Sequence, residues 1–160
     1  MRAIASAAAL TGSILMSHGG SLSAADPAVA CELLTQARVG AALGVAVGAG
    51  TPIARPGACQ WAGKGRIATL TITQPLGGKT PVEQFNAGKT SKRYGITTEP
   101  VSGVGDEAFY VYFATNTPRA AVGIVVRKGT STFEVRVYGF ALEEGKTIGK
   151  SLAQDVAGKF

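Results

Sequence analysis

Histidine is almost absent from this chain, because His18 is the only one among its 160 residues. His18 lies in an N-terminal segment that we expect to be removed, together with both methionines, Met1 and Met16. Without histidine, the Ser-His-Asp and Cys-His nucleophile systems cannot be assembled. Histidine-ligated zinc, copper and haem sites lack their ligands as well. A retained segment would supply one histidine, still too few for most such sites, so we predict no metal and no cofactor.

Long apolar runs are also lacking. Arg2 gives the chain a positive start, residues 3–16 are weakly apolar, and small residues suited to cleavage precede Asp26. The apolar run is too short, and too interrupted by polar residues and glycine, to span a bilayer as a helix. We therefore expect residues 1–25 to be a cleavable signal peptide and residues 26–160 to form one domain, periplasmic or secreted.

Acidic residues are fewer than basic ones, 10 against 16, which gives a formal net charge of +6. Such a modest excess is first of all a solubility charge. The largest basic cluster, Lys89, Lys92 and Arg93 on one predicted helix, is small for a nucleic-acid interface, where a basic stripe with interleaved aromatic residues is typical. Export argues against nucleic acid too, so we expect no nucleic-acid partner.

Cysteine occurs only twice, as Cys31 and Cys59. In an exported protein such a pair favours a disulfide bond. Closing this loop would stabilise the fold by about 3.5 kcal/mol in the chain-entropy model. The alternative is lipid attachment at Cys31, since Ala30 provides the small residue required before the cysteine. However, the leucine expected three positions before the cysteine is missing, so we favour the disulfide.

Helix starts are marked by capping residues. Asp26 followed by Pro27 is typical of an N-cap and first helical position, and Thr35 offers a second N-cap. Residues 28–43 therefore form either one helix or a short turn followed by a helix, which ends at Gly44. A Gly- and Pro-rich loop follows.

Two further helices are predicted. A capping box from Thr80 to Glu83, with proline at the first helical position, predicts a helix from residue 81 to Tyr94. Near the C-terminus, four apolar residues recur at a spacing of four, which predicts one buried stripe of a helix. These residues are Ile148, Leu152, Val156 and Phe160.

Alternating apolar and polar residues predict strands over most of the remaining chain. One expected strand begins at Cys59. The others cover residues 66–74, 97–101, 108–114, 120–128 and 131–139. A two-residue turn at Gly129 and Thr130 predicts a hairpin in which every apolar residue of one face meets an apolar partner. The predicted pairs are Lys128 with Ser131, Val126 with Phe133, Ile124 with Val135 and Val122 with Val137.

The resulting element order is roughly α-β-β-α-β-β-β-α, with a further short strand near residues 97–101. Hairpins in such an order favour an α+β fold, in which a mostly antiparallel sheet has helices packed on one face.

Asp106 and Glu107 are the most prominent carboxylates, and they follow two glycines. Adjacent residues of a strand point to opposite faces, so we do not expect the two to share one site. The first interpretation is a turn in which Asp106 hydrogen-bonds its own backbone. The alternative is that backbone N–H groups and Glu107 line a ligand cleft. A histidine-free hydrolase would need both carboxylates in one cleft, roughly 5 to 10 Å apart.

Aromatic residues of the predicted strands offer a binding surface. We expect Tyr110, Tyr112 and Tyr138 to share the sheet face opposite Phe109, with Arg136 and Glu134 nearby. Exposed aromatic side chains on a sheet are typical of a binding surface. The alternative is that a helix covers this face and that the tyrosine hydroxyls reach its rim.

Three short motifs together resemble a family of small bacterial cell-envelope proteins, which is catalogued as a domain of unknown function. The motifs are Cys-Glu-Leu-Leu-Thr at 31–35, Cys-Gln-Trp at 59–61 and Gly-Val-Gly-Asp-Glu-Ala at 103–108. The resemblance implies an extracytoplasmic α+β domain with paired cysteines, and it implies no activity or catalytic residue. Many members are lipid-anchored, whereas this chain lacks a good lipid-attachment site.

The composition and motifs favour an exported, non-enzymatic binding or interaction module of the bacterial cell envelope. Its expected partner is an envelope protein, a polysaccharide or a small apolar ligand. A structural envelope component is one alternative, and a hydrolase that uses Asp106 and Glu107 is another.

Overall fold

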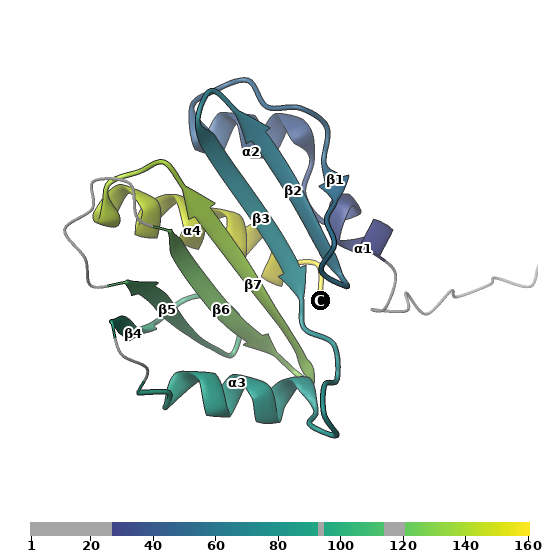
Figure 1. Ribbon diagram of the computed structural model, residues 1–160, viewed down its shortest axis with the longest axis vertical. Helices are drawn as coiled ribbons and strands as arrows, with labels where there is room; N and C mark the ends of the chain where they lie inside the picture. Colours follow the sequence, from purple (N-terminus) through teal and green to yellow (C-terminus); the bar gives the residue numbers. More distant parts are fainter. Residues whose placement is uncertain (1–26, 93–94, 114–120) are drawn as a thin grey trace, which may run out of the picture.

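The computed structural model describes residues 27–92, 95–113 and 121–160, and its fold is α+β (Figure 1). Seven antiparallel strands form one sheet in the order β1-β2-β3-β7-β6-β5-β4. The expected signal peptide, the Asp26 cap and Arg93 lie outside the described residues. The elements are α1 (Pro27–Glu32), α2 (Gln36–Leu43), β1 (Thr51–Pro52), β2 (Ala58–Gly63), β3 (Arg66–Ile72), α3 (Pro81–Lys89), β4 (Ile96–Val101), β5 (Glu107–Phe113), β6 (Val122–Lys128), β7 (Ser131–Tyr138) and α4 (Leu142–Ala157).

The β6–β7 hairpin has the predicted register, from Lys128 opposite Ser131 to Val122 opposite Val137. Gly129 has a φ of 58°, in the left-handed region that a type II′ turn requires at its first position. β6 and β7 lie at the centre of the sheet, so this register orients the strands on both sides of them.

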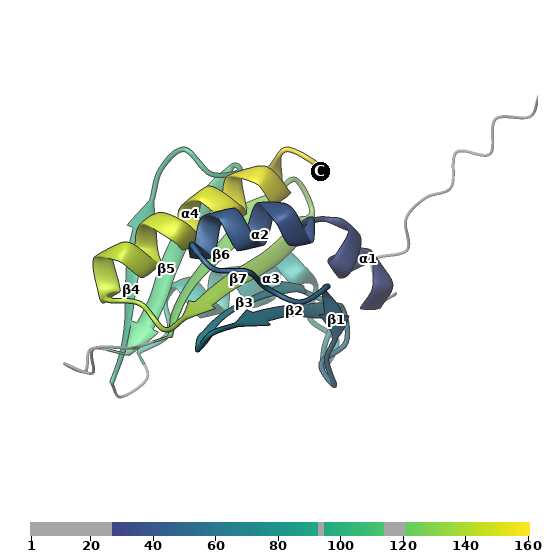
Figure 2. The same ribbon diagram turned by 90° about the horizontal axis from the view of Figure 1, so that it is seen from above.

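The two faces of the sheet differ in what covers them. Helices α1, α2 and α4 lie together on one side, which we call the core face (Figure 2). α3 crosses the ends of β6 and β7 on the opposite side, where the Phe85 ring lies 5.1 Å from the ring of Phe109 (Figure 1). The core face carries the largest buried side chains, which include Trp61, Leu70, Ile124, Phe133, Val135 and Val137.

Beyond α3, the opposite side of the sheet keeps exposed or half-buried side chains, and we call it the open face. Its residues are Gln60, Ile67, Thr69, Thr71, Val111, Phe113, Val125, Glu134, Arg136 and Tyr138.

Local capping explains most helix boundaries. The first helical region divides in two, and Thr35 caps α2 by accepting a hydrogen bond from the backbone N–H of Arg38. Gly44 ends α2 with a φ of 65°. The predicted capping box at Thr80 starts α3 as expected.

Two boundaries differ from the predictions. α3 ends at Lys89 rather than at residue 94, because Gly88 and Thr90 are poor helix formers at its end. α4 ends at Ala157, so Phe160 lies beyond the helix, where its ring stacks on Phe133 at 5.5 Å. The predicted loop before β2 also contains the short strand β1.

The predicted disulfide joins Cys31 of α1 to Cys59 of β2, with the two Cα atoms 5.1 Å apart. A cysteine in this bond has no thiol to carry a lipid. Trp61 lies beside the bond, since a Cβ atom at Gly50 would be 2.7 Å from its Nε1 and 2.9 Å from the Sγ of Cys59. The bond therefore ties the first helix to the most buried part of the sheet. Within the described residues, no helix is long and apolar enough to cross a membrane.

Reduction of this disulfide should lower the free energy of unfolding by about 3.5 kcal/mol, because the denatured chain regains the freedom of the closed loop. Urea titrations with and without dithiothreitol, followed by Trp61 fluorescence, measure the difference. The Cys31→Ala/Cys59→Ala variant is the control and should be insensitive to dithiothreitol. Equal urea midpoints for the oxidised and reduced wild type would contradict the prediction.

Candidate functional site

The three candidate tyrosines do not share one face. Tyr110 pairs with Ile124 and Tyr112 with Val122, which places both tyrosines on the core face beneath α4. Tyr138 pairs with Ile67 and lies on the open face, together with Arg136 and Glu134. The expected single surface is therefore divided between the two sides of the sheet. The cause is the β5–β6 register, which sets the tyrosines of β5 opposite the buried aliphatic residues of β6.

Tyr110 and Tyr112 belong to a cluster that we call the lysine clamp, formed with Glu99, Glu143 and Lys146. The Nζ of Lys146 lies 2.7 Å from Oε2 of Glu99 and 3.1 Å from Oε1 of Glu143, and its side chain is only 11% exposed. Tyr112 donates to the same Glu99 oxygen, at 3.0 Å, and Tyr110 donates to the backbone oxygen of Lys146 at 3.1 Å. The ammonium also lies 4.8 Å from the centre of the Tyr112 ring.

The clamp holds fixed charges. Burial alone would lower the pKa of Lys146, but hydrogen bonds to Glu99 and Glu143 outweigh burial, and the net pKa is raised. The pKa of Glu99 is lowered by the hydrogen bonds from Lys146 and Tyr112. Burial raises the pKa of Tyr112. Lys146 is thus no nucleophile and Tyr112 no base near neutral pH, and the clamp joins α4 to β4 and β5.

Asp106 braces the β6–β7 turn instead of bonding its own backbone. Its carboxylate accepts from the backbone N–H of Gly129 at 2.7 Å and from the Nζ of Lys128 at 3.3 Å. Glu107 forms an ion pair with Lys89. The guanidinium of Arg127 lies 3.5 Å from the carboxylate of Asp106 and 3.8 Å from that of Glu107. The two carboxylates therefore lie near each other, whereas alternation along a strand predicted them on opposite faces. Asp106 precedes β5, and strand alternation does not apply to it.

These carboxylates lack the acidity pattern of a hydrolase. The pKa of Asp106 is lowered, chiefly by the hydrogen bond from Gly129, and the pKa of Glu107 by the hydrogen bond from Lys89. Glycoside hydrolysis requires one carboxyl with a raised pKa as the general acid. Glu107 does line a hollow of about 330 Å³ with Lys89 and Phe109. Asp106 does not line this hollow, and the two carboxylates that do, Glu99 and Glu107, both have lowered pKa values.

The centre of the open face is built around Arg136. Its Nε donates to Oε1 of Glu134 at 2.9 Å, and its Nη2 bonds to the same oxygen. Arg136 stands opposite Gly123 of β6, where a Cβ atom would lie 2.6 Å from that oxygen. The missing side chain lets the ion pair lie flat across the sheet. Arg55 approaches Oε2 of Glu134 to 3.9 Å from the other side.

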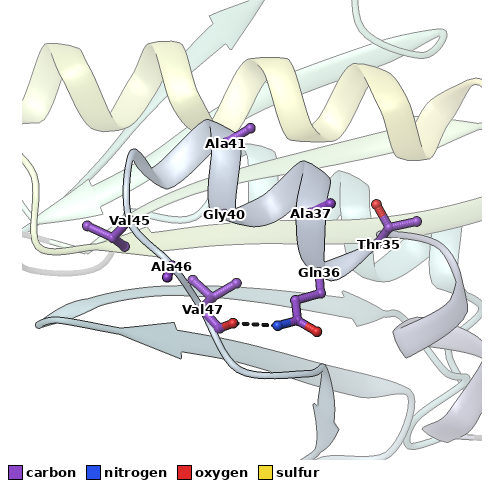
Figure 3. A pocket seen from close by; sticks show the side chains of 8 residues that line it. All are labelled: Thr35, Gln36, Ala37, Gly40, Ala41, Val45, Ala46 and Val47. Carbon is purple, nitrogen blue, oxygen red and sulfur yellow. Dashed lines mark hydrogen bonds between the residues drawn. The ribbon is translucent and has the colours of Figure 1, made fainter.

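A second concave region lies between α2 and the chain segment that follows it, with a volume of about 640 Å³ (Figure 3). Gln36 closes one side by donating to the backbone oxygen of Val47 at 2.7 Å. Its lining is small and uncharged, and consists of Thr35, Gln36, Ala37, Gly40, Ala41, Val45, Ala46 and Val47. The groove thus offers no charged group to orient a polar ligand.

Sequence reasoning identified Arg136 and Tyr138 but missed Arg55, Gly123 and Lys146. A glycine inside a strand pattern is a signal of close approach, and it could have drawn attention to Gly123. No group of three or more metal-ligating side chains occurs in the part of the chain that the structure describes. Comparisons with protein-family models, curated proteins and solved structures found no match to this chain.

Replacing Lys146 with methionine should lower the free energy of unfolding by about 1.5 kcal/mol, because Glu99 and Tyr112 lose a charged hydrogen-bond network. Thermal and urea denaturation measure the loss. Lys159→Met, at the exposed C-terminal end, is the matched control and should change stability by less than about 0.5 kcal/mol. A Lys146→Met variant as stable as the control would show that the clamp contributes nothing.

Acid should destabilise the fold through its paired carboxylates. The pKa values of Glu99, Asp106 and Glu107 are lowered from ordinary values of 4.5, 3.8 and 4.5. Groups with a lowered folded pKa contribute stability above the unfolded pKa, and that stability is lost as pH falls through the folded pKa. Urea midpoints should therefore fall steadily as the pH drops below these ordinary values. Asp106→Asn should reduce the slope, and an unchanged slope would contradict this origin of the acid sensitivity.

Proposed function

We propose that this chain is an exported, non-enzymatic binding module of the bacterial cell envelope, and that the open face is its binding surface. The observation that carries the proposal is the arrangement around Gly123, which leaves a flat, uncovered face with a fixed arginine, Arg136, at its centre. Arginine held in place by a carboxylate loses little freedom when it binds a partner, so such a residue is suited to recognition.

The sheet edges are poorly suited to binding by strand addition. The edge strand β1 has only two residues and includes Pro52, and the other edge strand, β4, includes Pro100. Short edges and prolines are the usual protections against pairing with another chain. A partner would therefore engage a face of the sheet rather than its edge.

The disulfide supports an extracytoplasmic compartment. A bond between Cys31 and Cys59 is typical of oxidising, extracytoplasmic compartments. The predicted signal peptide and the resemblance to small envelope proteins support the periplasm or secretion, with the mature chain beginning at Asp26.

Site-specific photo-crosslinking in the producing cells tests the proposal. We expect p-benzoylphenylalanine in place of Phe113, on the open face, to yield an adduct to another envelope molecule after irradiation of the full-length, exported protein. The same group in place of Glu144, exposed on α4, is the control and should yield none. A third position, Ala41, reports on the groove beside α2.

Adducts from Ala41 or Glu144 without any from Phe113 would overturn the open face as the binding surface. No adduct from any of the three positions would contradict a binding module.

A further inference from the structure

The open face carries more positive than negative charge at its centre. Glu134 is one carboxylate in contact with two arginines, Arg136 and Arg55. The carboxylate is the more buried partner, with 15% of its side chain exposed, against 35% for Arg136 and 62% for Arg55. A partner molecule would therefore meet guanidinium groups before it meets the carboxylate.

Hydrogen-bonding capacity remains on Arg136 after its internal contacts. A guanidinium has five N–H donors; Glu134 accepts from Nε and Nη2, and the side chain of Tyr138 is a further hydrogen-bond partner of the group. The donors beyond these contacts can bind an oxygen of a second carboxylate. Because Gly123 has no side chain, the guanidinium lies parallel to the sheet, and its donors point along the open face rather than away from it. The chain's overall positive charge would further favour the approach of an acidic partner.

An apolar flank adjoins this centre. Arg136, Gly123 and Val111 form one row across β7, β6 and β5, and Phe113 continues β5 with 52% of its surface exposed. Val125 lies on the same side of β6. Arginine and aromatic residues beside exposed aliphatic ones are the composition of a protein–protein interface. A polymer of sugar acids offers nothing comparable for the flank, and a small ligand prefers a concave site.

We infer that the open face docks an acidic segment of an envelope protein. Its carboxylates lie against Arg55 and Arg136, and its apolar side chains pack on Val111 and Phe113. This inference rests on the proposed function and names the partner class for the same surface. Charge complementarity steers the encounter, and the apolar flank distinguishes a protein from other polyanions.

Titration of the purified, oxidised chain with a synthetic peptide, in which glutamates alternate irregularly with leucines and serines, tests this assignment. Binding is followed by calorimetry and by amide NMR shifts. We expect shifts clustered at Thr69, Val111 and Arg136, and an affinity that falls as salt is raised. Peptides with glutamine for glutamate, or serine for leucine, should each bind about tenfold more weakly.

Variants separate the fork of Arg136 from its charge. Arg136→Gln should weaken binding about tenfold, and Arg136→Lys should fall between it and the wild type. Arg55→Gln, at a largely exposed position, should weaken binding about threefold and does not depend on the fold tolerating a change at Arg136. Lys159→Gln removes one positive charge elsewhere and should bind as the wild type does.

Several outcomes would overturn the inference. Polygalacturonate or anionic vesicles that bind as tightly as the glutamate–leucine peptide would show that the face recognises charge alone. Equal binding by wild type and Arg55→Gln, or shifts outside the open face, would remove its residues from the contact. If Phe113 yields crosslinked adducts but no acidic peptide binds, the binding function stands and the acidic partner is wrong.

Discussion

Burial of the aliphatic side of the central hairpin beneath α4 constrains almost every other feature of this protein. Val122, Ile124 and Val126 of β6 meet apolar partners of β7 across the core face, and all three are buried. Because side chains alternate along a strand, this burial sends Glu134 and Arg136 to the opposite side. A slip of one residue would bury that ion pair and expose the core. The same constraint that makes the core therefore makes the open face.

Glycine shapes both sides of β6. On the core face, Gly145 of α4 lets the helix approach closely, since a Cβ atom there would lie 3.0 Å from Cγ2 of Val122. A glycine within a helix weakens the helix by about 1 kcal/mol relative to alanine, but close packing on the sheet explains its place here. The approach also carries Lys146 to Glu99 and the tyrosines of β5. The close packing of α4 on the sheet thus also places Lys146 in the lysine clamp.

Features that depend on residues close together in the sequence were predicted correctly. The register of the β6–β7 hairpin follows from matching apolar residues across a two-residue turn, and the start of α3 follows from the capping box at Thr80. The disulfide was expected from a single pair of cysteines in a chain with a predicted signal peptide. In each case the deciding residues are few and the alternatives would leave unmatched apolar or polar groups.

The features that were not predicted depend on contacts between segments that are distant in the sequence. Tyr110 and Tyr112 lie opposite Phe109 as expected and a helix covers them, but Tyr138 lies on the other face. The β5–β6 register decides this, and a long connection fixes no register as a two-residue turn does. The position of α3 depends on Phe85 meeting Phe109, and the clamp on Lys146 reaching Glu99, 47 residues away in sequence. The sequence indicated the alternation within each strand, but it indicated the pairing between strands only for the β6–β7 hairpin.

The charged groups on the two faces of the sheet are held differently, and this difference is the reason that we propose binding at the open face. On the core face, charged and phenolic groups are paired with one another, and these hydrogen bonds lower the pKa of Glu99 and raise that of Lys146. At the start of β5, Asp106 and Glu107 are held as anions by Lys128, Lys89 and Arg127. Catalytic groups need the reverse arrangement, in which a neighbour destabilises the resting protonation state. On the open face, Arg136 keeps 35% of its side chain exposed, and a guanidinium that does not titrate near neutral pH is suited to holding a partner rather than to transferring a proton.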